Sequence, residues 1–295
     1  MIFEKHSSIS SLSETVALLT DKGDLNRALR LIHDAVERVI TEPLCVSQVF
    51  GSKVLDNLCQ SIGKANLAKV KLEIRDVEYF QSEVPVFVYV VTKLQKSGGH
   101  TQLIETFIKA RPDGLHYILS TELAGKTDSN DLFERLGKKS NIFLEKAAKV
   151  SFHNRLTWLQ KRLINLCPER VYLCNHHQDS IAVSAVVPEM ELSASFYHHG
   201  DHHLCLGVYL PHFEHIDFHP MGYYNCKDEL GIKNTYIPLM VEDQGDRPND
   251  MGFLRDGALI TCTAARSNKV EMPYFVNYCE MVPKIFYVFF SRTRP

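Results

Sequence analysis

This 295-residue chain contains 14 histidines, and many of them lie in one stretch of the sequence. Most of those in the second half fall close together: His176, His177, His198, His199, His202, His203, His212, His215 and His219. The imidazole titrates near neutral pH and can move a proton, hold a sugar hydroxyl or bind a metal ion. The clustering therefore predicts a functional region.

The segment Gly98-Gly99-His100-Thr101 offers a ligand-binding loop. It follows a run of β-branched and aromatic residues at 85–91 and opens an amphipathic helix at 100–110. Glycines permit a tight turn, and the N–H groups of a helix N-terminus favour a phosphate or a sugar hydroxyl. We predict that these four residues bind substrate or phosphate, although a plain strand-to-helix turn would have the same spacing.

A second motif, His176-His177 followed by Asp179, also stands between a predicted strand (170–175) and a predicted helix (179–187). Because an imidazole or carboxylate there could act as a general base toward a hydroxyl, all three are candidate catalytic residues. Asp179 could equally serve only as the N-cap of the helix.

The densest motif runs from His198 to His203, with Gly200 permitting a turn and Asp201 able to orient a neighbouring imidazole. Its candidate catalytic residues are His199 and Asp201, and its candidate binding residues are His202 and His203. A sugar- and phosphate-binding cleft is the favoured interpretation, and a zinc or di-metal centre or a set of structural histidines are the alternatives. Since neighbouring residues of a strand point to opposite faces, His198 and His199 are not expected to reach one ligand unless the strand has ended there.

A further group, His215, Asp217 and His219, shares one face of a predicted strand, whereas Ile216 and Phe218 share the other. A strand with one polar face and one packed face is favoured over a strand that ligates a metal. We therefore predict no metal ligands.

Strands alternate with helices between residues 69 and 240, which predicts a Rossmann-like, doubly wound α/β domain with a parallel sheet. The predicted strands are 70–74, 85–91, 115–121, 170–175, 192–198, 215–219 and 234–238, and the predicted helices are 100–110, 131–137, 141–166, 179–187 and 223–230. Apolar residues at helical spacing predict a small helical region at 1–68. Ligands of such sheets bind beyond the carboxyl ends of the strands, where the histidine motifs stand.

The polar stretch 241–257 contains Gly, Pro, Asn and Asp and predicts a linker. A new strand then opens a second α/β domain at 258–295, which is expected to be incomplete because such a domain needs about 100 residues. Arg266 and Lys269 follow this strand and could hold a diphosphate, with a solvated turn as the alternative.

The composition and charge of the chain argue against some classes of partner. A net charge of −2 and a pI of about 6.7 argue against a nucleic acid held by bulk positive charge. The longest apolar runs are too short to cross a bilayer, which predicts no integral membrane segment. Eight scattered cysteines without a CxxC pair indicate reduced thiols. We expect a cytoplasmic protein, with peripheral contact at the inner membrane left open.

Together these motifs resemble the GT-B class of glycosyltransferases, especially bacterial enzymes that build surface polysaccharides. The resemblance spans about residues 85–284 and rests on VYVVTKLQKSGGHTQLIETFIKA, YLCNHHQDSIAVSA, FYHHGDHHLCLG with HIDFHPMGYYNCKDELGI, and LITCTAARSNKVEMPY. It implies an acceptor-side domain at 69–240 that faces a donor-binding domain across a cleft.

The resemblance also implies transfer of a sugar from a nucleotide sugar, a co-substrate rather than a cofactor, to a glycan or lipid-linked acceptor. Gly98–Thr101 would line the cleft, the histidine motifs would form its floor, and Arg266 with Lys269 would neutralise the leaving diphosphate. The acidic motif of the class has no counterpart here, so the chain alone is expected to transfer no sugar. The alternatives are a His-rich metal-dependent hydrolase and a non-enzymatic interaction module whose N-terminal helices dock a protein partner.

Overall fold

A computed structural model describes residues 5–42, 45, 48–74, 80, 82–95, 99–128, 130–136, 140–199, 203–238 and 245. Contacts divide the chain into two units, Met1–Met240 and Val241–Pro295, and the fold below is that of the first. The predicted linker apart from Gly245 and the predicted second domain, with Arg266 and Lys269, lie outside the described residues, as do Gly98, Asp201 and His202.

Seven parallel strands form one sheet in the order β3-β2-β1-β4-β5-β6-β7. They are β1 (Val86–Val91), β2 (Leu115–Ser120), β3 (Ile142–Lys146), β4 (Arg170–Cys174), β5 (Ala194–His198), β6 (Phe213–Asp217) and β7 (Asn234–Tyr236). The central strand β1 is buried at every residue, as its unbroken apolar run predicts. The prediction of a parallel, Rossmann-like α/β sheet is confirmed.

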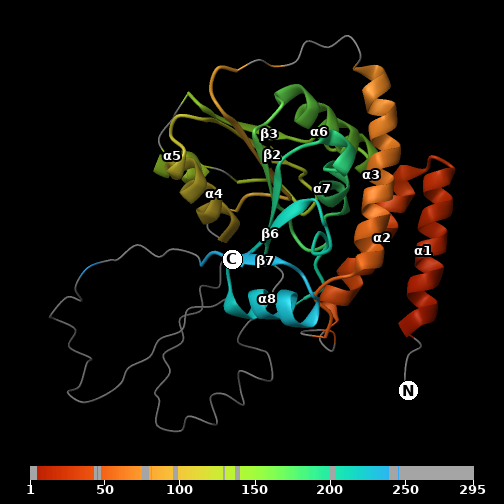
Figure 1. Ribbon diagram of the computed structural model, residues 1–295. Helices are drawn as coiled ribbons and strands as arrows, with labels where there is room; N and C mark the ends of the chain where they lie inside the picture. The colour runs from red at the N-terminus through yellow and green to blue at the C-terminus, as the bar shows by residue number, and fades with distance from the viewer. Residues whose placement is uncertain are drawn as a thin grey trace, which may run out of the picture. The chain divides into compact units, whose positions relative to one another are not determined.

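Helices cover both faces of the sheet (Figure 1). One layer contains α1 (Lys5–Asp21), α2 (Leu25–Thr41), α3 (Lys53–Glu73), α6 (Phe152–Leu166) and α7 (Ser180–Ala185), and the other contains α4 (Gly99–Ala110) and α5 (Asn130–Leu136). The N-terminal helices share a core with the sheet, and α3 approaches α7 closely. A Cβ atom on Gly63 would lie 1.9 Å from the carbonyl oxygen of Ser184, so only glycine permits this approach.

Some predicted elements differ from the structure. The strand expected at 70–74 is the last turn of α3, in which Val70 continues the buried side of the helix. The helix expected at 141–166 begins only at Phe152, and Ile142–Lys146 forms the edge strand β3. The charged residues of this strand, Glu145 and Lys146, also suit a helix; here Glu145 accepts a hydrogen bond from Arg162 of α6 and Lys146 donates to the carbonyl of Thr127. The strand expected at 215–219 lies two residues earlier, as β6.

The helix expected at 223–230 is also different. A short α8 (Pro220–Tyr224) is continued by a π-helical turn, η3 (Asn225–Glu229). Turns of this kind are rare and widen the helix locally. Here the turn contains Cys226, which is fully buried.

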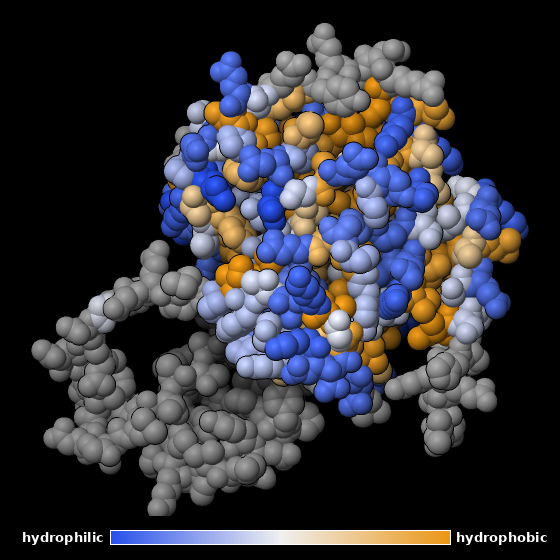
Figure 2. Space-filling view, viewed as in Figure 1, coloured by the Kyte–Doolittle hydropathy of each residue, from blue (hydrophilic) through white to orange (hydrophobic). Residues whose placement is uncertain are grey.

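Among the described helices, none is both long and apolar enough to cross a membrane. On the face shown in Figure 2, hydrophilic residues are interspersed with hydrophobic ones.

Candidate functional site

The order of the sheet reverses between β1 and β4: the chain winds outward through β2 to β3 on one side and through β5 and β6 to β7 on the other. In doubly wound sheets this switch point opens a crevice at the carboxyl ends of the strands, and ligands bind there. His100 lies in the first turn of α4, which follows β1, and His176 and His199 follow β4 and β5, so the predicted motifs meet at the switch point.

Three imidazoles from these loops are in contact. The ring centroid of His100 lies 3.8 Å from that of His199 and 5.3 Å from that of His176. Gly99 allows the approach, because a Cβ atom there would lie 3.1 Å from Cε1 of His199. All three side chains are half-buried, as a site that receives a ligand from solvent requires. We call His100, His176 and His199 the histidine triad.

The other predicted residues of these motifs lie around the triad. His177 and His203 contact each other, with ring centroids 5.8 Å apart. The hydroxyl of Thr101 donates to the carbonyl of Gln95 over 2.8 Å and is almost fully buried. Thr101 therefore connects the first turn of α4 to Gln95 and does not reach the surface.

Asp179 is the N-cap of α7, with Oδ1 accepting the N–H of Ala182 at 2.9 Å. Its Oδ2 accepts the hydroxyls of Thr92 and Thr121, each at 2.7 Å, and Thr92 Oγ1 accepts the backbone N–H of His176 at 2.8 Å. The carboxylate thus joins the ends of three strands. Because it has no exposed surface, we assign it a positioning role in place of the predicted catalytic one.

Burial favours the neutral forms of His100 and His176. Burial, followed by the neighbouring imidazoles of His199 and His176, holds the pKa of His100 well below the usual 6.5. Burial also lowers the pKa of His176, although the Asp179 carboxylate opposes that effect. Neutral imidazoles at physiological pH can accept a proton from a hydroxyl or hydrogen-bond to it.

No protein-family model matches this sequence, and no curated protein is similar enough to count as a relative. Function is therefore inferred from the motifs and their geometry.

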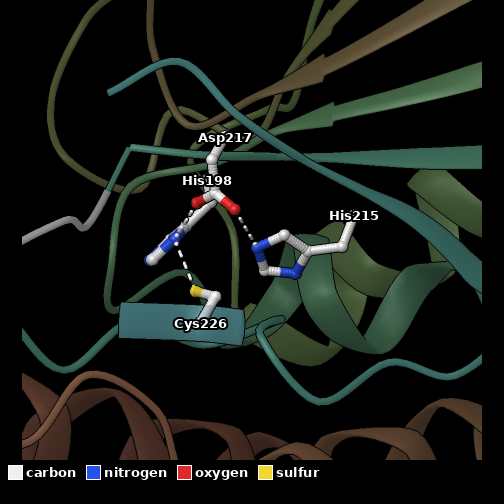
Figure 3. A group of neighbouring side chains, drawn as sticks. All are labelled: His198, His215, Asp217 and Cys226. Atoms are coloured by element: carbon white, nitrogen blue, oxygen red, sulfur yellow. Dashed lines mark hydrogen bonds and ion pairs between the residues drawn. The ribbon is translucent and has the colours of Figure 1, made fainter. Parts of the chain in front are cut away.

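A second cluster lies on the other side of β5. His198, His215, Asp217 and Cys226 point toward one another, and each is buried (Figure 3). His198 and His199 thus face opposite sides, as strand alternation predicts. The predicted shared face is found for His215 and Asp217, while Ile216 and Phe218 join the opposite core cluster. His219, predicted to share that face, lies beyond the strand and caps α8. We call these four residues the buried quartet.

Sequence reasoning missed three residues of these sites. Thr92 and Thr121 directly follow β1 and β2, a position that could have marked them, since loops at the carboxyl ends of strands form the crevice. Cys226 follows the His215–Asp217–His219 group along the chain, but it was not linked to that group, because a cysteine without a CxxC partner is most often a small packed side chain.

Proposed function

We propose that this chain provides the acceptor-side domain of a GT-B-type glycosyltransferase, which moves a sugar from a nucleotide sugar to a hydroxyl of a glycan or lipid-linked acceptor. The convergence of the histidine triad at the switch point carries the proposal. The sheet order and the resemblance of the motifs to that class support it.

The proposed chemistry is displacement at the anomeric carbon. The acceptor oxygen forms a bond to that carbon, the bond to the diphosphate breaks, and the nucleoside diphosphate leaves. Charge develops on the sugar ring as in glycoside hydrolysis. The proton of the acceptor hydroxyl must pass to a base, and an imidazole with a pKa near or below neutrality can take it.

His176 is the best-placed base of the triad. Its backbone is fixed to Thr92, and its half-buried ring lies at the end of a strand next to the switch point. His100 is less suited, because its Nε2 atom is buried and has no hydrogen-bond partner in the described part of the chain. The first turn of α4, which begins at Gly99, presents N–H groups that favour a phosphate of the donor.

Binding measurements with a matched pair of variants test the proposal. The purified chain is titrated with a panel of nucleotide sugars and glycans, and the strongest ligand is then titrated into H176Q and H153Q. His153 is also half-buried, but its Nε2 bonds to Asn66 on α3. We expect H176Q to weaken binding about tenfold, the equivalent of one hydrogen bond of about 1.4 kcal/mol, and H153Q to leave it unchanged. Equal affinity in both variants, or no binding by any member of the panel, would contradict the proposal.

The alternative of a metal-dependent hydrolase gains no support from the crevice. The group of metal-ligating side chains found in the described part of the chain is the buried quartet, which leaves no open position for a substrate. Catalytic zinc sites keep such a position.

A further inference from the structure

The buried quartet brings four ligand-bearing side chains together from three separate elements. His198 ends β5, His215 and Asp217 belong to β6, and Cys226 lies in η3. One ligand atom from each residue lies within 4.8 Å of all the others. We propose that these four side chains bind one structural zinc ion.

The backbone explains why the ligands converge. His198 and Asp217 are directly opposite each other in the parallel pairing of β5 with β6, and His215 is two residues before Asp217 on the same face. The π-helical turn lowers Cys226 onto this face, where its Sγ lies 3.4 Å from His198 Nδ1 (Figure 3).

The ligand atoms lie within 4.8 Å of one another, so a tetrahedral ion would draw the most distant pair together by up to about 1 Å. Zinc bonds of about 2.0–2.3 Å separate neighbouring ligand atoms by about 3.3–3.8 Å. The Cys226–His198 distance and the 3.3 Å between His215 Nε2 and Asp217 Oδ2 fall in this range. His198 Nδ1 donates to Asp217 Oδ1 over 2.8 Å, so these two atoms would separate by about half an ångström to accept the ion.

The donor set selects the metal. A thiolate and two imidazoles are ligands for zinc, whereas magnesium and calcium prefer oxygen alone. The side chains are at most 4% exposed, so the four protein ligands close the site. A closed, four-ligand site is characteristic of structural zinc.

His215 provides a second, independent observation. The residue is 4% exposed, and its Nε2 has a 3.3 Å ion pair with Asp217 Oδ2 that is not aligned as a hydrogen bond. A long, poorly aligned contact satisfies a buried imidazole only in part. A metal ion bound at the centre of the quartet would satisfy Nε2 fully.

An outer partner already orients the carboxylate. Asn234 on β7 donates through Nδ2 to Asp217 Oδ2 over 2.6 Å and to the carbonyl of Tyr223 over 2.9 Å. Such hydrogen bonds fix ligand orientation in metal sites. The ion would thus connect β5, β6 and η3, and it would hold the end of β5 from which His199 enters the crevice.

Metal analysis of the full chain tests the proposal. The chain is loaded with zinc, dialysed without chelator and analysed for metal, together with C226A and C174A. Cys174 is an equally buried cysteine at the end of β4 and is not part of the quartet. We expect about one zinc per chain in the unmodified protein and in C174A, and a loss of at least tenfold in C226A, as one thiolate ligand is removed.

Cobalt distinguishes a lost ligand from a lost fold. With Co²⁺ in place of zinc, the unmodified chain and C174A should show a thiolate-to-cobalt charge-transfer band, whereas H215Q, which keeps the thiol, should show a weakened band and faster loss of the ion. A zinc-free unmodified chain, zinc retained by C226A, or a cobalt spectrum without thiolate character would overturn the proposal. Stoichiometric iron in place of zinc would overturn the choice of metal.

Discussion

Replacing Asp179 by alanine should destabilise the protein far more than replacing another helix-capping aspartate. The substitution removes the N-cap of α7 and leaves the buried hydroxyls of Thr92 and Thr121 without their acceptor. A lost cap costs about 1 kcal/mol, and each buried hydroxyl left unsatisfied costs about 1–3 kcal/mol. Together these contributions reduce the free energy of unfolding by about 3–7 kcal/mol.

Asp24 supplies the matched control. It caps α2 by accepting the N–H of Arg27 at 3.2 Å, but its side chain is 38% exposed. D24A should therefore lose only about 0.5–1 kcal/mol. Urea unfolding of both variants gives the comparison. Similar losses in the two would refute the view that Asp179 holds the strand ends together, and a stable D179A that no longer binds ligand would restore the catalytic interpretation.

Three further predictions concern the same layers. The pKa values of His100 and His176 are depressed in the folded state, so the unfolded chain binds more protons below about pH 6.5. The free energy of unfolding should have its full value above this pH and should fall as the pH drops. Denaturant unfolding at a series of pH values measures this dependence, which H100Q should weaken. G63A should reduce the free energy of unfolding by about 1–3 kcal/mol, since its methyl group would meet the Ser184 carbonyl. S61A, on the exposed side of α3, should change this free energy little. Equal shifts of the melting temperature in the two variants would contradict the close approach of α3 to α7. G99A should leave the free energy of unfolding unchanged or raise it by up to about 1 kcal/mol. Its methyl group should displace His199, so a titration should show weaker ligand binding. Unchanged affinity would contradict the assigned contact between Gly99 and His199.

The sequence was sufficient to predict the sheet but not all of its edges. The apolar run of β1 and the alternation of strands with helices predict the parallel architecture, because buried central strands leave this pattern. β3 was missed because an edge strand needs only one packed face, and its charged residues also suit a helix. The π-helical turn at η3 depends on tertiary packing around Cys226 and leaves no local pattern.

The candidate sites, too, could be predicted from the sequence only in part. The predicted meeting of the motifs around His100, His176 and His199 follows from topology, since loops at the carboxyl ends of adjacent strands must be neighbours. Strand alternation likewise predicts which histidines share a face. The joining of β5, β6 and Cys226 into the buried quartet could not be predicted, because spacing along the chain does not show which side chains a distant turn brings down onto a sheet.

Histidine NMR during a ligand titration tests the central claim most directly. The chain is labelled at the histidine ring carbons, and nucleotide sugars and glycans are added one at a time. Ligand entry at the switch point should shift the signals of His100, His176 and His199. The signal of His116 should stay in place, because this residue is buried near the amino end of β2 and bonds to the carbonyl of Arg111. Shifts confined to histidines outside the triad, or none with any sugar ligand, would contradict the proposed glycosyl-transfer site.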